Sequence, residues 1–184
     1  MIEYELKQDN EFDYWKKTSP VAEERWYQTY RPLEPYIESC PGSMLDIGCG
    51  AWPYSLRFAH HPVTLVDPLM DGYAGLPWTN IADAEQRFRF IDEVPVDARF
   101  DIAFVLNCLD HMPRKMAVHL LTRLDAQVEQ LICGFVDFRR QPDQYHYVWS
   151  DDVLAFLPHF SHVFSKTIDR GQFTGVLFAY QRKP

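Results

Sequence analysis

One segment sets the architecture of the whole chain: Met44-Leu45-Asp46-Ile47-Gly48-Cys49-Gly50, followed directly by Ala51-Trp52-Pro53-Tyr54-Ser55. The short apolar run at its start is typical of a buried strand, and two glycines one residue apart let the backbone turn tightly against a ligand. Pro53 suits the first turn of a helix, where its missing N–H costs nothing, and we expect that helix to continue over residues 55–59. A strand, a glycine turn and a helix in this order indicate the opening of a nucleotide-binding α/β unit.

Two classes of cofactor use such a turn, and the residues around the glycines favour one of them. The dinucleotide fingerprint has a third glycine three residues after the second, where this chain has Pro53. Asp46 stands two residues before the first glycine, and a carboxylate there repels a pyrophosphate but attracts a cationic ligand. The segment therefore predicts S-adenosylmethionine as the cofactor, and an NAD-type Rossmann oxidoreductase is the less favoured alternative.

Two parts of the chain resemble a known family. The run Asp46-Ile47-Gly48-Cys49-Gly50 resembles motif I of the class I S-adenosylmethionine-dependent methyltransferases, an acidic residue followed by x-Gly-x-Gly, and the segment from Asn107 to His111 resembles their motif IV. Pro53 departs from the family pattern, in which many members have a further small residue nearby. The resemblance covers residues 43–184. It implies a Rossmann-like, doubly wound α/β sheet of seven strands, mostly parallel, with an antiparallel strand in a C-terminal hairpin.

Hydrophobic runs after the glycine turn predict the remaining elements of such a sheet. Strands are expected at residues 62–67, 88–91, 100–107 and 131–138, and a hairpin at 163–168 and 173–181. Helices are expected from about residue 113 to 128 and from 150 to 157, with a helical turn at 81–86 in an otherwise irregular segment.

Asp67 follows the second predicted strand and is a candidate ligand for ribose. It lies about 20 residues beyond the glycine turn, the spacing at which an acidic residue reaches the ribose hydroxyls. A carboxylate can accept two hydrogen bonds there. The alternative is that Asp67 only caps the turn that begins at Pro68.

The family resemblance adds contacts at the ends of the next two strands. Asp92, or alternatively Glu93, would bind the exocyclic amine of adenine, with the Ile91 backbone N–H on the ring; a solvated acidic pair without a role is the competing interpretation. Asn107 would hydrogen-bond the amino or carboxylate group of the methionine part. The full set of predicted cofactor-binding residues is Asp46, Gly48, Cys49, Gly50, Asp67, Pro68, Ile91, Asp92, Asn107 and Cys108.

Catalysis of methyl transfer requires mainly alignment and exclusion of water, because the sulfonium methyl group is already activated. If the acceptor is a hydroxyl, a base must take its proton, and His111 titrates near neutrality. Asp110 could orient that ring or be the base itself, and His146 is a second candidate. His111 could equally be a polar residue in the first turn of a helix, and a non-catalytic S-adenosylmethionine-binding protein on this fold stays an alternative. No metal-ligand motif such as H-E-x-x-H occurs, so we expect a metal-independent reaction.

The first 42 residues precede the predicted core. Apolar residues at helical spacing predict helices at about 10–18 and 21–30 and a short one before residue 39. These helices either cover one face of the sheet or form a lid whose aromatic residues line the acceptor side, namely Tyr14, Trp15, Trp26, Tyr27 and Tyr30. We therefore expect residues 1–184 to form one methyltransferase domain, with a helical cap or lid at 1–42 and a cofactor-binding core at 43–184.

Composition limits the partners. The net charge of −8 and the lack of a dense basic cluster disfavour a nucleic-acid substrate, so a small-molecule acceptor is expected. No apolar run approaches the roughly 20 residues that span a membrane, and the first residues lack the pattern of a signal peptide. The four cysteines are widely spaced, which fits a reducing compartment, and the predicted location is cytoplasmic.

Overall fold

The structure is a computed structural model that describes residues 2–18, 24, 27–40, 42–58, 60–109, 112–137, 150–169 and 174–184. Within these residues no helix has the length and apolar character that a membrane crossing would need.

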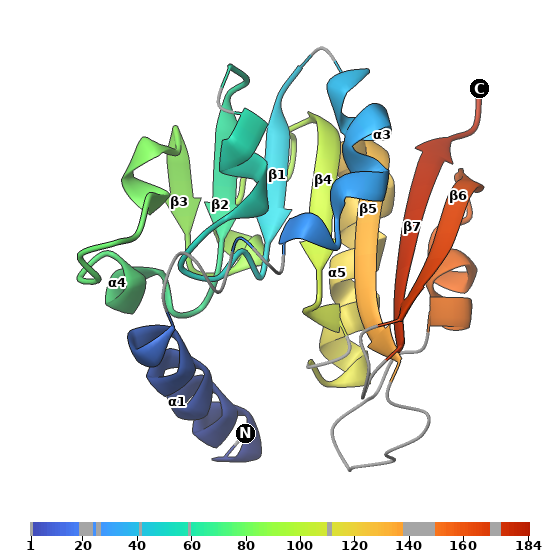
Figure 1. The fold of residues 1–184 in the computed structure, drawn as a ribbon. Coiled ribbons are helices and arrows are strands. Elements are labelled where there is room, and N and C mark those ends of the chain that lie inside the picture. The colour runs from blue at the N-terminus through green and yellow to red at the C-terminus, as the bar shows by residue number, and fades with distance from the viewer. Residues whose placement is uncertain are drawn as a thin grey trace.

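Seven strands form one sheet in the order β3-β2-β1-β4-β5-β7-β6 (Figure 1). β1 to β5 pair in parallel, and β7 lies antiparallel between β5 and β6. The strands are β1 (Met44–Ile47), β2 (Val63–Val66), β3 (Gln86–Phe88), β4 (Phe100–Leu106), β5 (Val128–Asp137), β6 (Phe160–Asp169) and β7 (Thr174–Arg182). The predicted fold class, a mostly parallel seven-stranded sheet with an antiparallel C-terminal hairpin strand, is confirmed.

Helices cover both faces of the sheet, with α3 in front and α5 behind in the view of Figure 1. The α-helices with described bounds are α1 (Ile2–Lys17), α3 (Glu34–Glu38), α4 (Met70–Tyr73) and α5 (Arg114–Gln127). Short 3₁₀ helices complete the connections: η1 (Arg31–Leu33), η2 (Tyr54–Phe58), η3 (Ile81–Asp83), η4 (Ile91–Glu93) and η6 (Ser150–Phe156).

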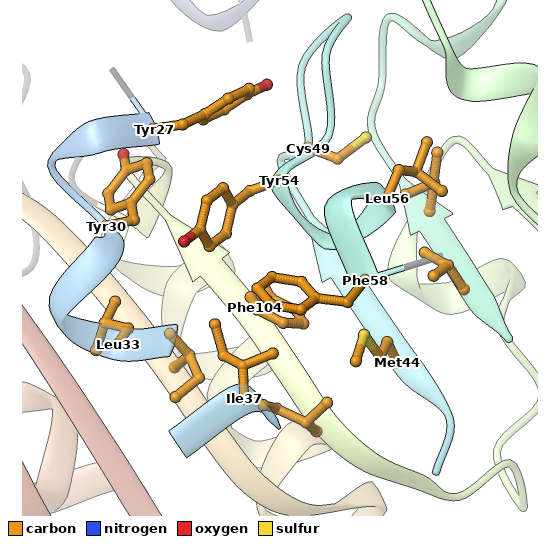
Figure 2. Packing of buried hydrophobic residues seen from close by; sticks show 14 of the residues in the cluster. Tyr27, Tyr30, Leu33, Ile37, Met44, Cys49, Tyr54, Leu56, Phe58 and Phe104 are labelled. Atoms are coloured by element: carbon orange, nitrogen blue, oxygen red, sulfur yellow. The ribbon is translucent and has the colours of Figure 1, made fainter. Parts of the chain in front are cut away.

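Alternating side chains of the central strand divide the core into two clusters, because successive residues of a strand point to opposite faces. Ile102 and Phe104 of β4 belong to the front cluster, where Figure 2 shows Phe104 beside Phe58 and Tyr54 of η2 and near Ile37 of α3. Ala103 of β4 belongs to the rear cluster, which packs on α5. A strand buried on both faces explains why this run is almost entirely apolar.

The structure corrects three predicted elements. The third strand is Gln86–Phe88 rather than 88–91, because residues 86–88 pair with β2 and the chain then turns into η4. The helix after the glycine turn is the 3₁₀ helix η2, which begins at Tyr54 directly after Pro53. The first helix starts at Ile2 rather than at residue 10. Its first turns have no strong apolar stripe by which the sequence could have located them.

The order of the strands indicates where on the sheet a ligand would bind. β1 pairs with β2 on one side and with β4 on the other, so the chain changes direction across the sheet at these strands. In an open α/β sheet, ligands bind beside the carboxyl ends of the strands at such a reversal.

Candidate functional site

The turn after β1 has the backbone conformation that only glycine adopts easily. Gly48 and Gly50 have φ angles of 64° and 65°, in the left-handed region that side chains disfavour. A Cβ atom on Gly48 would lie 2.5 Å from the Cβ of Cys108, and one on Gly50 would lie 2.4 Å from the Trp15 ring. Both glycines therefore permit close contacts with neighbouring segments as well as the turn.

A pocket of about 940 Å³ lies at the carboxyl ends of β1, β2 and β4. Its lining includes all ten residues predicted to bind the cofactor: Asp46, Gly48, Cys49, Gly50, Asp67, Pro68, Ile91, Asp92, Asn107 and Cys108. The structure thus brings these residues to one cavity, and their contacts with a cofactor stay a prediction.

Asp46 is buried beneath the turn and binds the start of η2. The backbone N–H and the hydroxyl of Ser55 donate to its Oδ2 at 3.2 Å and 2.7 Å. Burial raises the pKa of Asp46 to about 6, and the two hydrogen bonds from Ser55 oppose that shift. This carboxylate is held by the fold at the floor of the pocket.

Asp67 connects the ends of β1 and β2. Its Oδ2 accepts a hydrogen bond from the Gly50 N–H at 3.1 Å, and its Oδ1 accepts one from the Leu69 N–H at 2.9 Å. Burial raises the pKa of Asp67 to about 6, while these two bonds lower it. Each carboxylate oxygen has a second lone pair, so both can accept a further hydrogen bond from a ligand.

Asn107 has a strained backbone and an unsatisfied side chain. Its φ angle is 56°, in the left-handed region, and its N–H donates to the Gly134 carbonyl at 2.7 Å. Its Oδ1 is buried and accepts no hydrogen bond from any residue that the structure describes. A buried acceptor without a donor is costly, and strain of this kind is typical of binding sites. Asn107 Oδ1 therefore offers a hydrogen-bond acceptor to a ligand in the pocket.

Asp92 lies on η4 and is bound by α5. Its Oδ1 is 2.8 Å from the Nε2 of His119 and 3.7 Å from an Nη of Arg123. His119 also lines the pocket. His119 and Arg123 could not be identified as partners from the sequence, because only the packing of α5 beside η4 brings them to Asp92.

Aromatic residues of the N-terminal segment divide between two regions. Trp15 lies against Gly50 and beside Tyr73 and Trp78, with ring centroids 6.0 Å and 6.1 Å away. Tyr27 and Tyr30 instead pack on Tyr54, at 5.4 Å and 5.3 Å (Figure 2).

These aromatic positions bear on the predicted lid. Four of the five aromatic residues predicted to line the acceptor side, Tyr14, Trp15, Tyr27 and Tyr30, line the pocket. Trp15 lies against Gly50 of the glycine turn, which is the part of the pocket predicted to bind the cofactor. Trp26 lies outside the described residues.

The candidate bases Asp110, His111 and His146 lie outside the described residues. Met112, just after the first two, lines the pocket. Among the residues that are described, no three His, Cys, Asp or Glu side chains are placed to hold a metal ion.

Comparisons with known proteins give matches in structure. No family model matches the chain, and no curated protein matches its sequence. Solved structures do match: the PH0226 protein from Pyrococcus horikoshii OT3 has a TM-score of 0.69 at 16% identity, over 93% of this chain and 99% of that chain. The chain has the class I methyltransferase fold.

Two further structures with this methyltransferase fold were solved with a bound product nucleoside. The N-methyltransferase NodS from Bradyrhizobium japonicum WM9, in complex with S-adenosyl-L-homocysteine, has a TM-score of 0.66 at 16% identity, over 91% of this chain and 90% of that chain. Magnesium protoporphyrin IX methyltransferase from Synechocystis PCC 6803, with the same nucleoside, has a TM-score of 0.66 at 13% identity, over 96% and 95%.

Proposed function

We propose that this protein is an S-adenosylmethionine-dependent methyltransferase that acts on a small molecule. The observation that carries the proposal is the pocket at the carboxyl ends of β1, β2 and β4, where the glycine turn, Asp67 and Asn107 border one cavity. Two structural neighbours of this fold were crystallised with S-adenosylhomocysteine; both are named methyltransferases, and the name of one specifies a small molecule, magnesium protoporphyrin IX.

The residues present fit this cofactor. The buried Oδ1 of Asn107 lacks a donor among the described residues, and the ammonium group of the methionine part can supply one. Asp67 can accept hydrogen bonds from the ribose hydroxyls beyond those it already accepts from Gly50 and Leu69. Ile91 and Asp92 on η4 line the pocket, and we assign the binding of adenine to them.

The cofactor would supply an activated methyl group, and the chain's own residues would bind, orient and shield it. Gly48 and Gly50 give the turn its positive φ angles and let Cys108 and Trp15 pack against it, since a side chain at either position would collide with these neighbours. Trp15 and Tyr27, both buried at the pocket wall, would exclude water from the reaction. Buried carboxylates below the turn favour the positive charge of the sulfonium.

We further propose that the acceptor atom is a hydroxyl oxygen, with His111 or Asp110 as the base that takes its proton. The proposal comes from their position in the sequence after β4: Asp110 directly follows Leu109, and His111 comes next. His111→Ala and Asp110→Ala should each leave cofactor affinity unchanged. The variant that lacks the true base should lower turnover by roughly 10²-fold or more. Its turnover rate should also no longer increase with pH as the base of the native chain loses its proton. A turnover and pH profile like those of the native chain in both variants would contradict this assignment.

Calorimetric titration with S-adenosylhomocysteine and with NADH tests the cofactor. We expect saturable binding of the first and none of the second, and the reverse would favour the oxidoreductase. Consumption of S-adenosylmethionine with a panel of hydroxylated, amino and carboxylate acceptors then tests turnover. Tight cofactor binding without turnover on any acceptor would instead support the non-catalytic binding protein.

A further inference from the structure

Helix α1 packs against the part of the pocket formed by the glycine turn and α4. Figure 1 shows it below the carboxyl ends of the strands, beside α4. The Phe12 ring lies 6.1 Å from that of Tyr73 on α4, and the Trp15 ring lies so close to Gly50 that a Cβ there would be 2.4 Å from it. Gly50 and Tyr73 line the pocket together with Asp67, and the Gly50 N–H donates to Asp67, so this side of α1 borders the pocket near Asp67.

Glu11 is the charged residue that α1 presents to this cavity. It lines the pocket, one helical turn before Trp15. The indole N–H of Trp15 donates to its Oε1 at 2.9 Å, so the ring that contacts the glycine turn also holds the carboxylate in place. Its Oε2 accepts no hydrogen bond from any residue in the described part of the chain.

Glu11 and Asp67 face the same space from different elements. After burial itself, the negative charge of Glu11 is among the causes that raise the pKa of Asp67, and it acts in the same direction on Tyr73. Two carboxylates near each other are unfavourable unless donors or a cation lie between them. Both carboxylates line the same pocket, so a ligand with hydrogen-bond donors for each of them would suit this space.

We propose that Glu11 is a second carboxylate for the cofactor's ribose, opposite Asp67, and that α1 is therefore part of the cofactor site. This inference rests on the proposed function. A ribose diol has two O–H donors, which matches one carboxylate on β2 and one on α1. Trp15 is the positioning residue, because it fixes Glu11 by a hydrogen bond and α1 by its contact with Gly50.

The test is calorimetric binding of S-adenosylhomocysteine to the native chain, Glu11→Ala and Asp13→Ala. Asp13 is the matched control: like Glu11 it is an exposed carboxylate on α1, but it pairs with Lys16 at 3.2 Å and does not line the pocket. Alanine favours the helix at both positions. We expect Glu11→Ala to weaken binding roughly tenfold, as for a lost hydrogen bond to a charged group, and Asp13→Ala to leave it unchanged. Repeating the titrations with an analogue that lacks both ribose hydroxyls should remove the difference between Glu11→Ala and the native chain.

The possible results distinguish a failure of the role proposed for Glu11 from a failure of the proposed function. If the native chain binds the nucleoside but Glu11→Ala binds as tightly as Asp13→Ala, the role of Glu11 is overturned and the proposed function stands. If Glu11→Ala weakens both ligands equally, Glu11 acts through the docking of α1, and the ribose contact is overturned. If the native chain binds neither, the proposed function fails and this inference fails with it.

Discussion

Asp67 has both a structural role in the sheet and a proposed role in binding ribose. Its carboxylate holds the glycine turn through Gly50 and the start of the next segment through Leu69. We predict that Asp67→Ala weakens S-adenosylhomocysteine binding by about 1.5–3 kcal/mol, the value of hydrogen bonds to a charged group. Calorimetry beside Asp83→Ala, an exposed carboxylate outside the pocket, measures the effect. Equal affinities in the two variants would exclude Asp67 from the site.

Asp46 makes the stability of the ligand-free protein depend on pH. Burial raises its pKa from 3.8 to about 6 in the folded chain, so its ionisation costs more when folded than when unfolded. The stability that the protonated group contributes is lost as the pH rises through about 6. Asp46→Asn should remove a fall in the free energy of unfolding on the order of 3 kcal/mol between pH 4 and 7. Urea unfolding across this range measures it, and parallel curves for variant and native chain would contradict the prediction.

Gly50 is required for two separate physical reasons, its positive φ and the Trp15 ring beside it. Gly50→Ala should therefore destabilise the protein by about 1–3 kcal/mol and weaken cofactor binding. Gly75→Ala is the matched control, because its added Cβ would meet only a carbonyl oxygen at 3.4 Å. Thermal unfolding of both variants gives the comparison. A Gly50→Ala variant as stable as Gly75→Ala would show that neither constraint matters.

Some site residues could be predicted from sequence because their position follows from strand ends. Asp67 and Asn107 stand directly after apolar runs, and parallel strands bring such positions to one edge. Glu11 and His119 could not be predicted in this way. Each reaches the pocket only through the packing of a helix, α1 or α5, and a local pattern does not specify that packing.

At the level of elements, apolar runs located the central strands within a few residues, and the errors occurred where such runs are poor guides. Phe90 is 44% exposed, so the apolar run beginning at Phe88 did not mark a buried strand; pairing with β2 ended β3 at Phe88. At the start of α1, Ile2, Tyr4 and Leu6 alternate with polar residues, and this period of two does not indicate a helix. Helix α4 was missed within a segment read as irregular, because four residues are too few to show helical periodicity.

Helix α1 should respond to the cofactor if it borders the site. We predict that S-adenosylhomocysteine slows amide hydrogen exchange across residues 2–17, because a ligand between α1 and the sheet disfavours local opening of this helix. Mass spectrometry with β7 as the internal reference measures the change. Exchange in α1 that is the same with and without the nucleoside, while the pocket strands become protected, would contradict this prediction.

For the molecule as a whole, the order of strands explains how residues distant in sequence form one site. β1 lies between β2 and β4, so the segments after these three strands meet at the same edge, with α1 closing the side near α4. The fold class was predicted from the resemblance of the glycine-turn segment to a known family and from the apolar runs that follow it. The position of the N-terminal segment did not follow, since no local signal relates α1 to the glycine turn.

A crystal structure with S-adenosylhomocysteine tests this account most directly. We predict that the ribose lies beside Asp67, the adenine beside Ile91 and Asp92, and the amino group of the homocysteine part within hydrogen-bond distance of the Asn107 Oδ1. A nucleoside bound elsewhere on the chain, or bound here with none of these contacts, would contradict it.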